Sequence, residues 1–224
     1  MNSLCFVILN YRQSVFVLRD VANLERLCPS ASFVIVDNNS EDGSFETLSK
    51  ELSQKPSIRI ISNFENSGYA RGNNLGIEVA LNTFSPEFVA IMNPDVVIPN
   101  AKVIEESLNA LERNEDLAIC TGLMVDSTWN LNWRIVAWKV PDKLDDVLMN
   151  VPIISSVFGP IWYKSLSATR DGILTVESVP GSFFIAKASC LRRMGFFDEK
   201  TFLYCEERIL GARAKRLGLK MSLV

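Results

Sequence analysis

Hydrophobic residues in the first 125 positions form short, nearly unbroken runs that alternate with stretches of helical periodicity. Unbroken apolar runs are typical of strands that are buried on both faces of a sheet. The predicted strands cover residues 4–9, 33–36, 58–61, 88–92 and 117–125. The predicted helices between them cover about 14–27, 43–52, 69–81 and 101–113. This alternation predicts a mostly parallel sheet with helices on both faces.

The regular pattern stops near Val125 and resumes near Val176. All four tryptophans lie in the irregular stretch, at Trp129, Trp133, Trp138 and Trp162. Beyond it, the pattern predicts extended chain over 176–186, helices over 188–194 and about 205–217, and a last strand over 220–224. At this length we expect both halves to belong to one domain.

Composition supports a globular protein and argues against several other classes. Of the 224 residues, 48% are hydrophobic and 22% are charged, as in ordinary globular domains. The net charge of −3 provides no general positive field, so nucleic acid is not expected as a partner. No stretch approaches the roughly 20 apolar residues that span a bilayer, and the N-terminus lacks the pattern of a signal peptide. We therefore expect a cytoplasmic protein, with peripheral contact at the inner face of the cell membrane left open.

The sequence contains no histidine, which excludes Ser-His-Asp and Cys-His catalysis and His-ligated metal sites within the chain. A general base must then be a carboxylate, Lys, Tyr or Cys. The five cysteines include no CxxC pair, and we expect reduced, mostly buried thiols. The eleven glycines form neither a GxGxxG motif nor a P-loop. Because the first 42 residues contain no glycine, a nucleotidylyltransferase with a Gly-rich triphosphate loop is disfavoured.

Polar segments follow three of the predicted strands, at residues 10–12, 37–44 and 93–95. Ligands of parallel sheets bind beyond the carboxyl ends of the strands, so we expect these segments to gather at one edge. Asp37 is either a turn residue or an acceptor for base or ribose groups. Asp95 is either a turn residue or a ligand of a divalent cation that bridges two phosphates.

Two further patterns have both a structural and a functional interpretation. Gly68, Gly72 and Gly76 recur every four residues, which indicates either close helix–sheet packing or room for a ligand beside the backbone. Glu206 and Glu207 open a predicted helix, where the helix dipole favours acidic residues. Adjacent helical residues point about 100° apart, so at most one of the two aims squarely into a given site.

Motifs over nearly the whole chain resemble, in residues and order, those of family 2 glycosyltransferases, and of bacterial rhamnosyltransferase-like members in particular. They lie at residues 6–11, 36–44, 66–76, 93–95, 179–184 and 195–206. The resemblance implies the GT-A fold, a Rossmann-like α/β fold whose mixed, mostly parallel central sheet is flanked by helices. A single domain over 1–224 would have a nucleotide-sugar-binding half at 1–125 and an acceptor-side half at 126–224. Because many relatives continue beyond the position of Val224, we expect the second half to be short at its C-terminus.

The resemblance also implies a reaction. An inverting enzyme would move a sugar, with rhamnose one candidate, from a nucleoside-diphosphate donor to a hydroxyl of a polysaccharide or lipid-linked acceptor. The residues implied for nucleotide-sugar binding are Asn10, Tyr11, Asp37, Asn39, Arg71, Asn74, Asn93 and Asp95. Asp95 would also hold a divalent cation, Mn²⁺ or Mg²⁺. The residues implied for the acceptor side are Gly181 and Ser182. Tryptophans prefer sites with one apolar and one wet face, so the stretch 129–163, with Trp129 and Trp133, either belongs to the acceptor side and touches a membrane or fills a second small core.

The catalytic base of the family is the Asp of a Glu-Asp pair, and Glu207 stands at that position with Glu206 as its rival. We expect the helix dipole to keep Glu207 ionised near neutral pH and to weaken it as a base. Asn93 replaces the first acid of the family's DxD-type motif, and Ile209 stands where the family often has another Asp. These departures leave a second hypothesis open, a nucleotide-sugar-binding relative with impaired catalysis.

Overall fold

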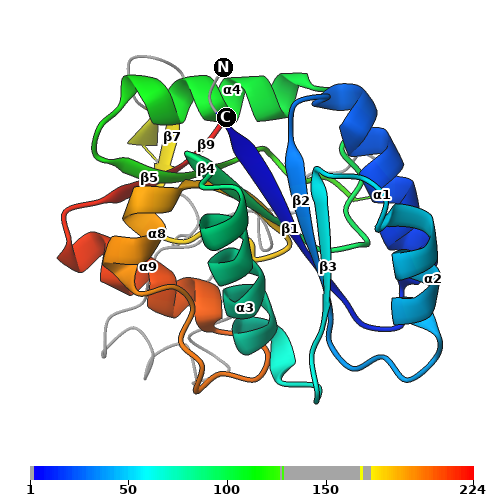
Figure 1. The fold of residues 1–224 in the computed structure, drawn as a ribbon. Coiled ribbons are helices and arrows are strands. Elements are labelled where there is room, and N and C mark those ends of the chain that lie inside the picture. The colour runs from blue at the N-terminus through cyan, green and yellow to red at the C-terminus, as the bar shows by residue number, and fades with distance from the viewer. Residues whose placement is uncertain (1–2, 127, 129–166, 169–172) are drawn as a thin grey trace.

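The computed structural model describes residues 3–126, 128, 167–168 and 173–224, and within them the chain forms one sheet covered by helices (Figure 1). The strands are β1 (Leu4–Asn10), β2 (Ser32–Asp37), β3 (Ile58–Ser62), β4 (Phe88–Met92), β5 (Leu117–Thr121), β6 (Ser167–Ala168), β7 (Leu174–Val176), β8 (Phe183–Lys187) and β9 (Lys220–Leu223). The helices are α1 (Ser14–Leu27), α2 (Ser44–Leu52), α3 (Gly68–Thr83), α4 (Lys102–Arg113), α8 (Ala188–Met194) and α9 (Glu206–Arg216). None of these helices has the length and apolar content that crossing a membrane requires.

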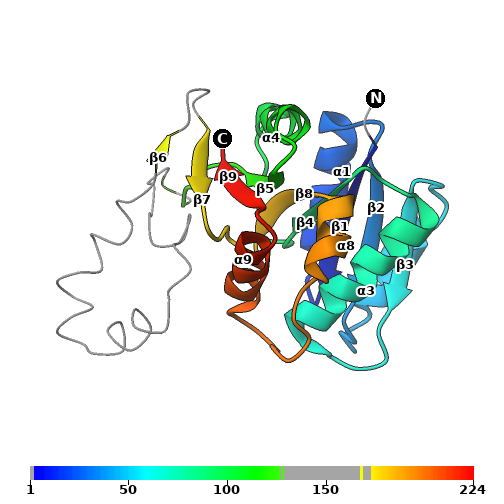
Figure 2. The same cartoon turned by 90° about the vertical axis from the view of Figure 1, so that its left-hand side faces the viewer.

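The strand order is β3-β2-β1-β4-β8-β5-β9-β7-β6, which can be followed across Figure 2. β1 pairs in parallel with β2 and β4, β2 with β3, and β5 with β9. β8 is antiparallel to β4 and β5, and β7 is antiparallel to β9 and β6. Among the described strands, β7 and β8 alone run against the others, which confirms the predicted mixed, mostly parallel sheet.

The position of β8 determines what lies at the edge of the sheet. It comes from the second half of the chain, yet it lies between β4 and β5 of the first half. Because β8 runs antiparallel to β4, it begins where β4 ends, and Phe183 pairs with Met92. Gly181 and Ser182, which precede β8, therefore enter beside the polar turn that follows β4.

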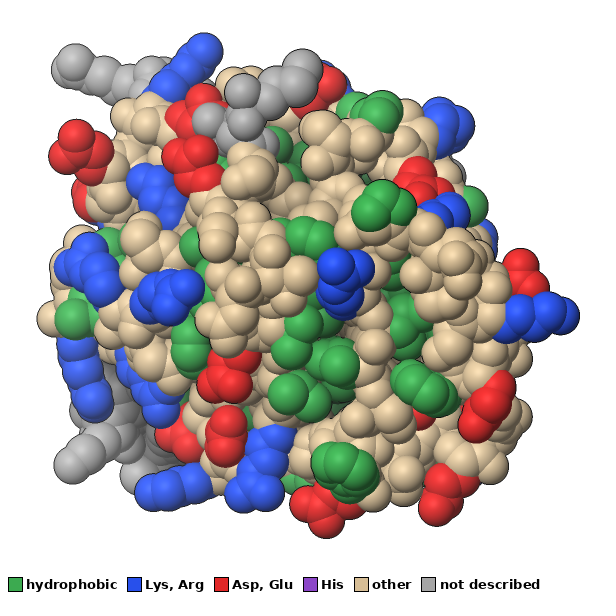
Figure 3. Space-filling model, viewed as in Figure 1, with side chains coloured by type: hydrophobic (Ala, Val, Ile, Leu, Met, Phe, Trp, Pro, Cys, Tyr) green, Lys and Arg blue, Asp and Glu red, His purple; other side chains and the backbone are tan. Residues whose placement is uncertain are grey.

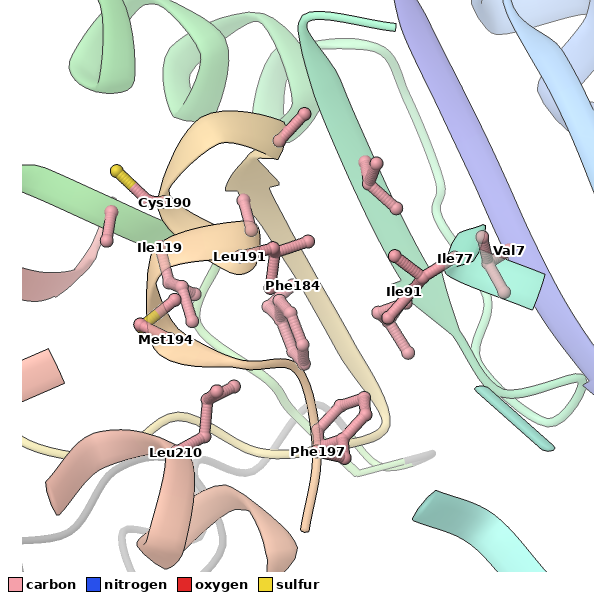
Figure 4. Packing of buried hydrophobic residues seen from close by; sticks show 14 of the residues in the cluster. Val7, Ile77, Ile91, Ile119, Phe184, Cys190, Leu191, Met194, Phe197 and Leu210 are labelled. Carbon is pink, nitrogen blue, oxygen red and sulfur yellow. The ribbon is translucent and has the colours of Figure 1, made fainter. Parts of the chain in front are cut away.

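Two hydrophobic clusters, one on each face of the sheet, fill the space between the sheet and its helices. On one face, Val7 and Val36 pack with residues of α3, α8 and α9, and Figure 4 shows part of this cluster around Phe184. On the other face, Phe6 and Ile8 pack with residues of α1, α2 and α4. Side chains of a strand alternate between faces, so the unbroken apolar runs of β1 and β2 supply both clusters.

The glycine repeat of α3 allows the helix to approach β1 closely. A Cβ at Gly72 would come within 2.5 Å of Leu9 Cδ1, and a Cβ at Gly76 would come within 3.0 Å of Val36 Cγ2 and overlap Val7. Both distances are shorter than carbon atoms tolerate. Of the two interpretations of this repeat, the structure supports helix–sheet packing at these two positions.

The predicted elements agree closely with the observed ones, and the differences have local causes. The strand predicted over 117–125 ends at Thr121, because Gly122 follows and Leu123 and Val125 are exposed. Of the extended stretch predicted over 176–186, only Val176 belongs to β7 and only 183–186 to β8, and the chain between them passes through Pro180 and a turn that begins at Gly181. Cys5, Cys120 and Cys190 are buried and all five thiols are unpaired, as predicted, although Cys205 is exposed.

Candidate functional site

The predicted strand-end residues meet at one edge of the sheet. Asn10 and Asp37 end neighbouring parallel strands and are paired in register. Asn93 follows β4 directly, and its backbone N–H donates to the Ser182 carbonyl at 2.8 Å. The edge thus brings together segments from both halves of the chain, as expected from the direction of β8.

Asn10 and Asp37 form a buried hydrogen-bond network. The Asn10 side chain donates to Asp37 Oδ1 at 2.6 Å and to Ser40 Oγ at 3.2 Å. Ser40 donates to the same carboxylate twice, from its hydroxyl to Oδ1 at 2.5 Å and from its backbone N–H to Oδ2 at 3.1 Å. Asn10 and Asp37 are 0% and 2% exposed, so their first role is to fix the turn after β2. Oδ2 of Asp37 can accept one further hydrogen bond. A contact between Asp37 and the base of a nucleotide stays a prediction.

Tyr11 and Asn39 lie on the outer side of this network. Tyr11 is 41% exposed, and the guanidinium of Arg12 lies 5.1 Å from the centre of its ring. Asn39 is half-buried and has φ of 59°, in the left-handed region that Asn tolerates better than most residues. Both side chains lie at the expected edge.

The turn that carries Asp95 is attached to α1. Arg19 donates to the Pro94 carbonyl at 3.0 Å and forms an ion pair with its neighbour Asp20. Asp20 is buried, and its Oδ2 has no hydrogen-bond partner in the described part of the chain. Burial raises the pKa of Asp20 to about 6, although Arg19 opposes this, and the charge of Asp95 adds to the rise. Asp95 itself is exposed.

Arg71 and Asn74 differ in how far their side chains are buried. Asn74 is 5% exposed, and its amide forms two hydrogen bonds of 3.0 Å with the backbone of Phe197 and one of 3.1 Å with Glu199. This arrangement favours a structural role for Asn74, which fastens α3 to the segment after α8. Arg71 is exposed, and its Nε lies 3.7 Å from Glu199 Oε2. Arg71 is therefore better placed than Asn74 to reach a ligand.

Glu206 and Glu207 start α9 and face different surroundings. Glu206 is 2% exposed, and its Oε2 has no hydrogen-bond partner in the described residues. Glu207 is half-buried, and its carboxylate lies against Gly181. The segment before β8 and the start of α9 therefore meet at the Glu207 carboxylate.

The pKa of Glu207 corrects the expectation drawn from the helix dipole. Burial raises the pKa of this carboxyl, and the charge of Glu206 raises it further. Hydrogen bonds to the backbone of Glu207 and Gly181 lower it by less. Desolvation disfavours the charged form more strongly than the helix start favours it, so Glu207 is a stronger base than a solvent-exposed Glu. Burial also raises the pKa of Glu206.

Sequence reasoning missed Tyr69, the second residue of α3. Its hydroxyl donates to the Gly181 carbonyl at 2.5 Å. The pKa of Tyr69 lies well above its usual range because of desolvation, and the charges of Glu207, Glu206 and Asp95 add to this. The charges of these three carboxylates therefore act on the Tyr69 phenol, and the Gly181 carbonyl joins Tyr69 to the segment that Glu207 contacts. The only signal in the sequence was a hydroxyl-bearing aromatic residue inside the motif at 66–76.

Two predicted acceptor-side residues, Trp129 and Trp133, lie outside the described residues, as do Trp138, Trp162 and Tyr163. Gly181 and Ser182 are described. Gly181 is buried between Tyr69 and Glu207, and the Ser182 hydroxyl lies 3.2 Å from Met124 Sδ.

Comparison with known proteins assigns the chain to a family. The sequence model of the family described as "Glycosyl transferase family 2" matches residues 5–189. A curated relative from Haloferax volcanii, the low-salt glycan biosynthesis hexosyltransferase Agl10, is 26% identical over 99% of this chain and 64% of its own length. The N-acetylglucosaminyl-diphospho-decaprenol L-rhamnosyltransferase of Mycobacterium tuberculosis is 26% identical over 84% of this chain and 62% of its own length. The chain therefore spans less than two thirds of the curated relatives it matches.

Solved structures share the fold at low sequence identity. A mannosyltransferase from Pyrobaculum calidifontis in complex with GDP-Man and Mn²⁺ has a TM-score of 0.65 at 14% identity, over 99% of this chain and 56% of its own. A GalNAc-T7 structure with UDP, GalNAc and Mn²⁺ has a TM-score of 0.71 at 12% identity, over 100% of this chain and 42% of its own. At these identities the likeness establishes the fold alone, and it confirms the predicted GT-A class.

Proposed function

Because the chain belongs to glycosyl transferase family 2, we propose that it is an inverting transferase that moves a hexose from a nucleoside-diphosphate donor to an acceptor hydroxyl. The observation that carries the proposal is the position of the Glu207 carboxylate, half-buried against Gly181. Gly181 is joined through Ser182 to the turn that carries Asp95. The two carboxylates proposed as base and as phosphate-side ligand thus belong to adjoining segments at one sheet edge.

In this proposal Glu207 removes the proton of the acceptor hydroxyl as that oxygen attacks the anomeric carbon. Its partly desolvated carboxylate accepts a proton more readily than a solvated one would. Attack from the face opposite the leaving diphosphate inverts the anomeric configuration. Asp37, Asn39 and Tyr11 would contact the nucleotide from the ends of β1 and β2, and Arg71 would contact it from α3.

The residues at the edge are compatible with one divalent cation. The described part of the chain has no group of three His, Cys, Asp or Glu residues placed to hold a metal. Asp95 is an exposed carboxylate two residues after Asn93, and Mg²⁺ is often bound through one or two carboxylates together with substrate phosphates. Asp95 and Asn93 would hold the ion, which would neutralise the charge of the leaving diphosphate. Two of the related folds carry Mn²⁺ in their structures.

The acceptor would be a polysaccharide or a lipid-linked saccharide, and contact with an anionic membrane would help to present the latter. The described residues offer a surface for this contact, the α8–α9 basic face, formed by Arg192, Arg193, Lys215 and Arg216. All four are exposed. Figure 3 shows Lys and Arg side chains gathered over the region of α8 and α9. Each Lys or Arg near an anionic bilayer contributes about 1 kcal/mol of attraction.

A panel of donors tests the proposed function. The protein is incubated with nucleotide-linked rhamnose, mannose, glucose and N-acetylglucosamine, with and without Mn²⁺, and with saccharide and lipid-linked acceptors. We expect transfer, or slow donor hydrolysis, with one donor. A rise in melting temperature with a donor but neither transfer nor hydrolysis would support the second hypothesis, a binding protein with impaired catalysis.

A further inference from the structure

Tyr69 joins the segment before β8, which the Glu207 carboxylate contacts, to the segment before α9, which leads to Glu207. We propose that Tyr69 is a positioning residue, which holds Glu207 in place by fastening the segment before β8 and the segment before α9 to the start of α3. The inference rests on the proposed role of Glu207 as the base. It assigns Tyr69 no contact with the substrate.

The first connection is made by the backbone. The Tyr69 N–H donates to the Phe202 carbonyl at 2.7 Å. Gly68 has φ of 81° and lies so close to Phe202 that a Cβ would overlap the carbonyl oxygen. The segment that follows Phe202 needs such an anchor, because Tyr204 and Cys205 have φ of 72° and 70° just before α9. Positive φ values cost free energy in residues other than Gly, so the surrounding contacts must hold this segment.

The second connection is made by the side chain. The Tyr69 hydroxyl donates to the Gly181 carbonyl at 2.5 Å, and its ring packs edge-on against Phe197 with 5.7 Å between ring centres. Gly181 in turn is the residue against which the Glu207 carboxylate lies. Tyr69 therefore supports Glu207 from both sides, through Phe202 along the chain and through Gly181 across the site.

The electrostatic surroundings of Tyr69 argue against an acid–base role. Its phenol is desolvated and close to the charges of Glu207, Glu206 and Asp95, all of which favour the protonated form. The phenol proton is already donated to Gly181. The charged groups that act on Glu207 itself are Glu206 and Arg208. The hydroxyl of Tyr69 thus has a fixed position and a fixed protonation state, as a positioning group requires.

Tyr69→Phe tests the inference because it removes the hydroxyl and keeps the ring that packs against Phe197. With Gly181 less constrained and Glu207 better solvated, we expect kcat to fall about 10- to 100-fold. The pKa of Glu207 should move down toward its ordinary value, which shifts the acidic limb of the rate profile to lower pH. Nucleoside-diphosphate binding should be unchanged. Tyr204→Phe is the matched control, since it removes the hydroxyl of an exposed tyrosine near the same helix start.

A second measurement does not require activity. The Glu207 carboxyl is titrated by ¹³C NMR in glutamate-labelled protein, with its signal assigned by Glu207→Gln. A lower pKa in Tyr69→Phe supports the inference even if the parent transfers no sugar, in which case the proposed function alone fails. An unchanged Glu207 titration in Tyr69→Phe, with only a lower melting temperature, would show that Tyr69 is merely structural and would overturn the inference.

Discussion

The Glu207 carboxylate lies directly over the Cα of Gly181 and leaves no room for a side chain there. An ideal Cβ at position 181 would overlap Oε1 and lie 3.0 Å from Cδ and 3.1 Å from Cγ of Glu207. An Asp at position 207 would carry its carboxylate one methylene further back. A side chain as long as that of Glu fits at position 207 in this orientation because position 181 has no side chain.

Gly181→Ala should displace the Glu207 carboxylate and reduce transfer by about 100-fold, because misplacement by about 1 Å has that effect on catalysis. Donor binding should be retained. Adding Glu207→Asp to Gly181→Ala should recover part of the loss, since the shorter side chain makes room for the new methyl group. A double-mutant cycle on kcat measures this coupling, and strictly additive effects would contradict the linkage.

Glu207→Gln should leave donor binding intact and reduce transfer by about 10²- to 10⁴-fold, the usual contribution of a general base. Because the pKa of Glu207 is raised, kcat/KM of the parent should rise with pH through a value above the ordinary Glu pKa and then level off. Glu206→Gln is the comparison. Loss of transfer in Glu206→Gln with full transfer in Glu207→Gln would assign the base to Glu206.

Asp95→Ala should remove most of the dependence of nucleoside-diphosphate binding on Mn²⁺ or Mg²⁺. The exposed carboxylate is the group that would complete a coordination shell made largely of phosphate oxygens. Isothermal titration calorimetry of the diphosphate, with and without metal, measures this in the parent and the variant. Equal affinities in the parent under both conditions would exclude the metal role.

Asp20→Asn should stabilise the protein at neutral pH and have less effect in acid. The folded-state pKa of Asp20, about 6, lies above the ordinary value of 3.8, so the parent loses stability as pH rises from about 4 through 6. The unfolding free energy of Asp20→Asn relative to the parent should grow by about 1–3 kcal/mol over this range. Urea unfolding at several pH values measures the difference, and a constant difference would show that Asp20 is not the group responsible.

The pair Arg192→Glu and Arg193→Glu should reduce flotation of the protein with anionic vesicles at low salt. Reversing two charges of the α8–α9 basic face replaces attraction to the lipid headgroups with repulsion. The matched control reverses Arg26 and Lys50, which are exposed on α1 and α2, across the sheet. No flotation of the parent protein would remove membrane contact from the proposed function.

Local patterns in the sequence were sufficient to predict most of the fold. Apolar runs located β1, β2 and β4 because strands buried on both faces need apolar side chains at every position. They did not show that β8 lies between β4 and β5, because strand order depends on long-range pairing. Within the candidate site, the motif resemblance singled out Asp95 and Glu207, and their roles stay predictions. It did not show that Asn74 is bound to Phe197, or that burial at Glu207 outweighs the helix dipole, because both depend on distant neighbours.

The junction between β5 and β8 has a consequence for how such a protein can diversify. The Thr121 hydroxyl, at the end of β5, donates to the Phe183 carbonyl, at the start of β8, at 2.7 Å. The sequence between them, which also supplies the outer strands β6 and β7, therefore starts and ends at adjacent points of the sheet. An insertion whose ends lie this close together can vary between homologues without moving β1, β2 and β4, the strands that carry the polar strand-end residues. Under the proposed function, selection could then change acceptor preference through this stretch while the proposed donor side is inherited intact.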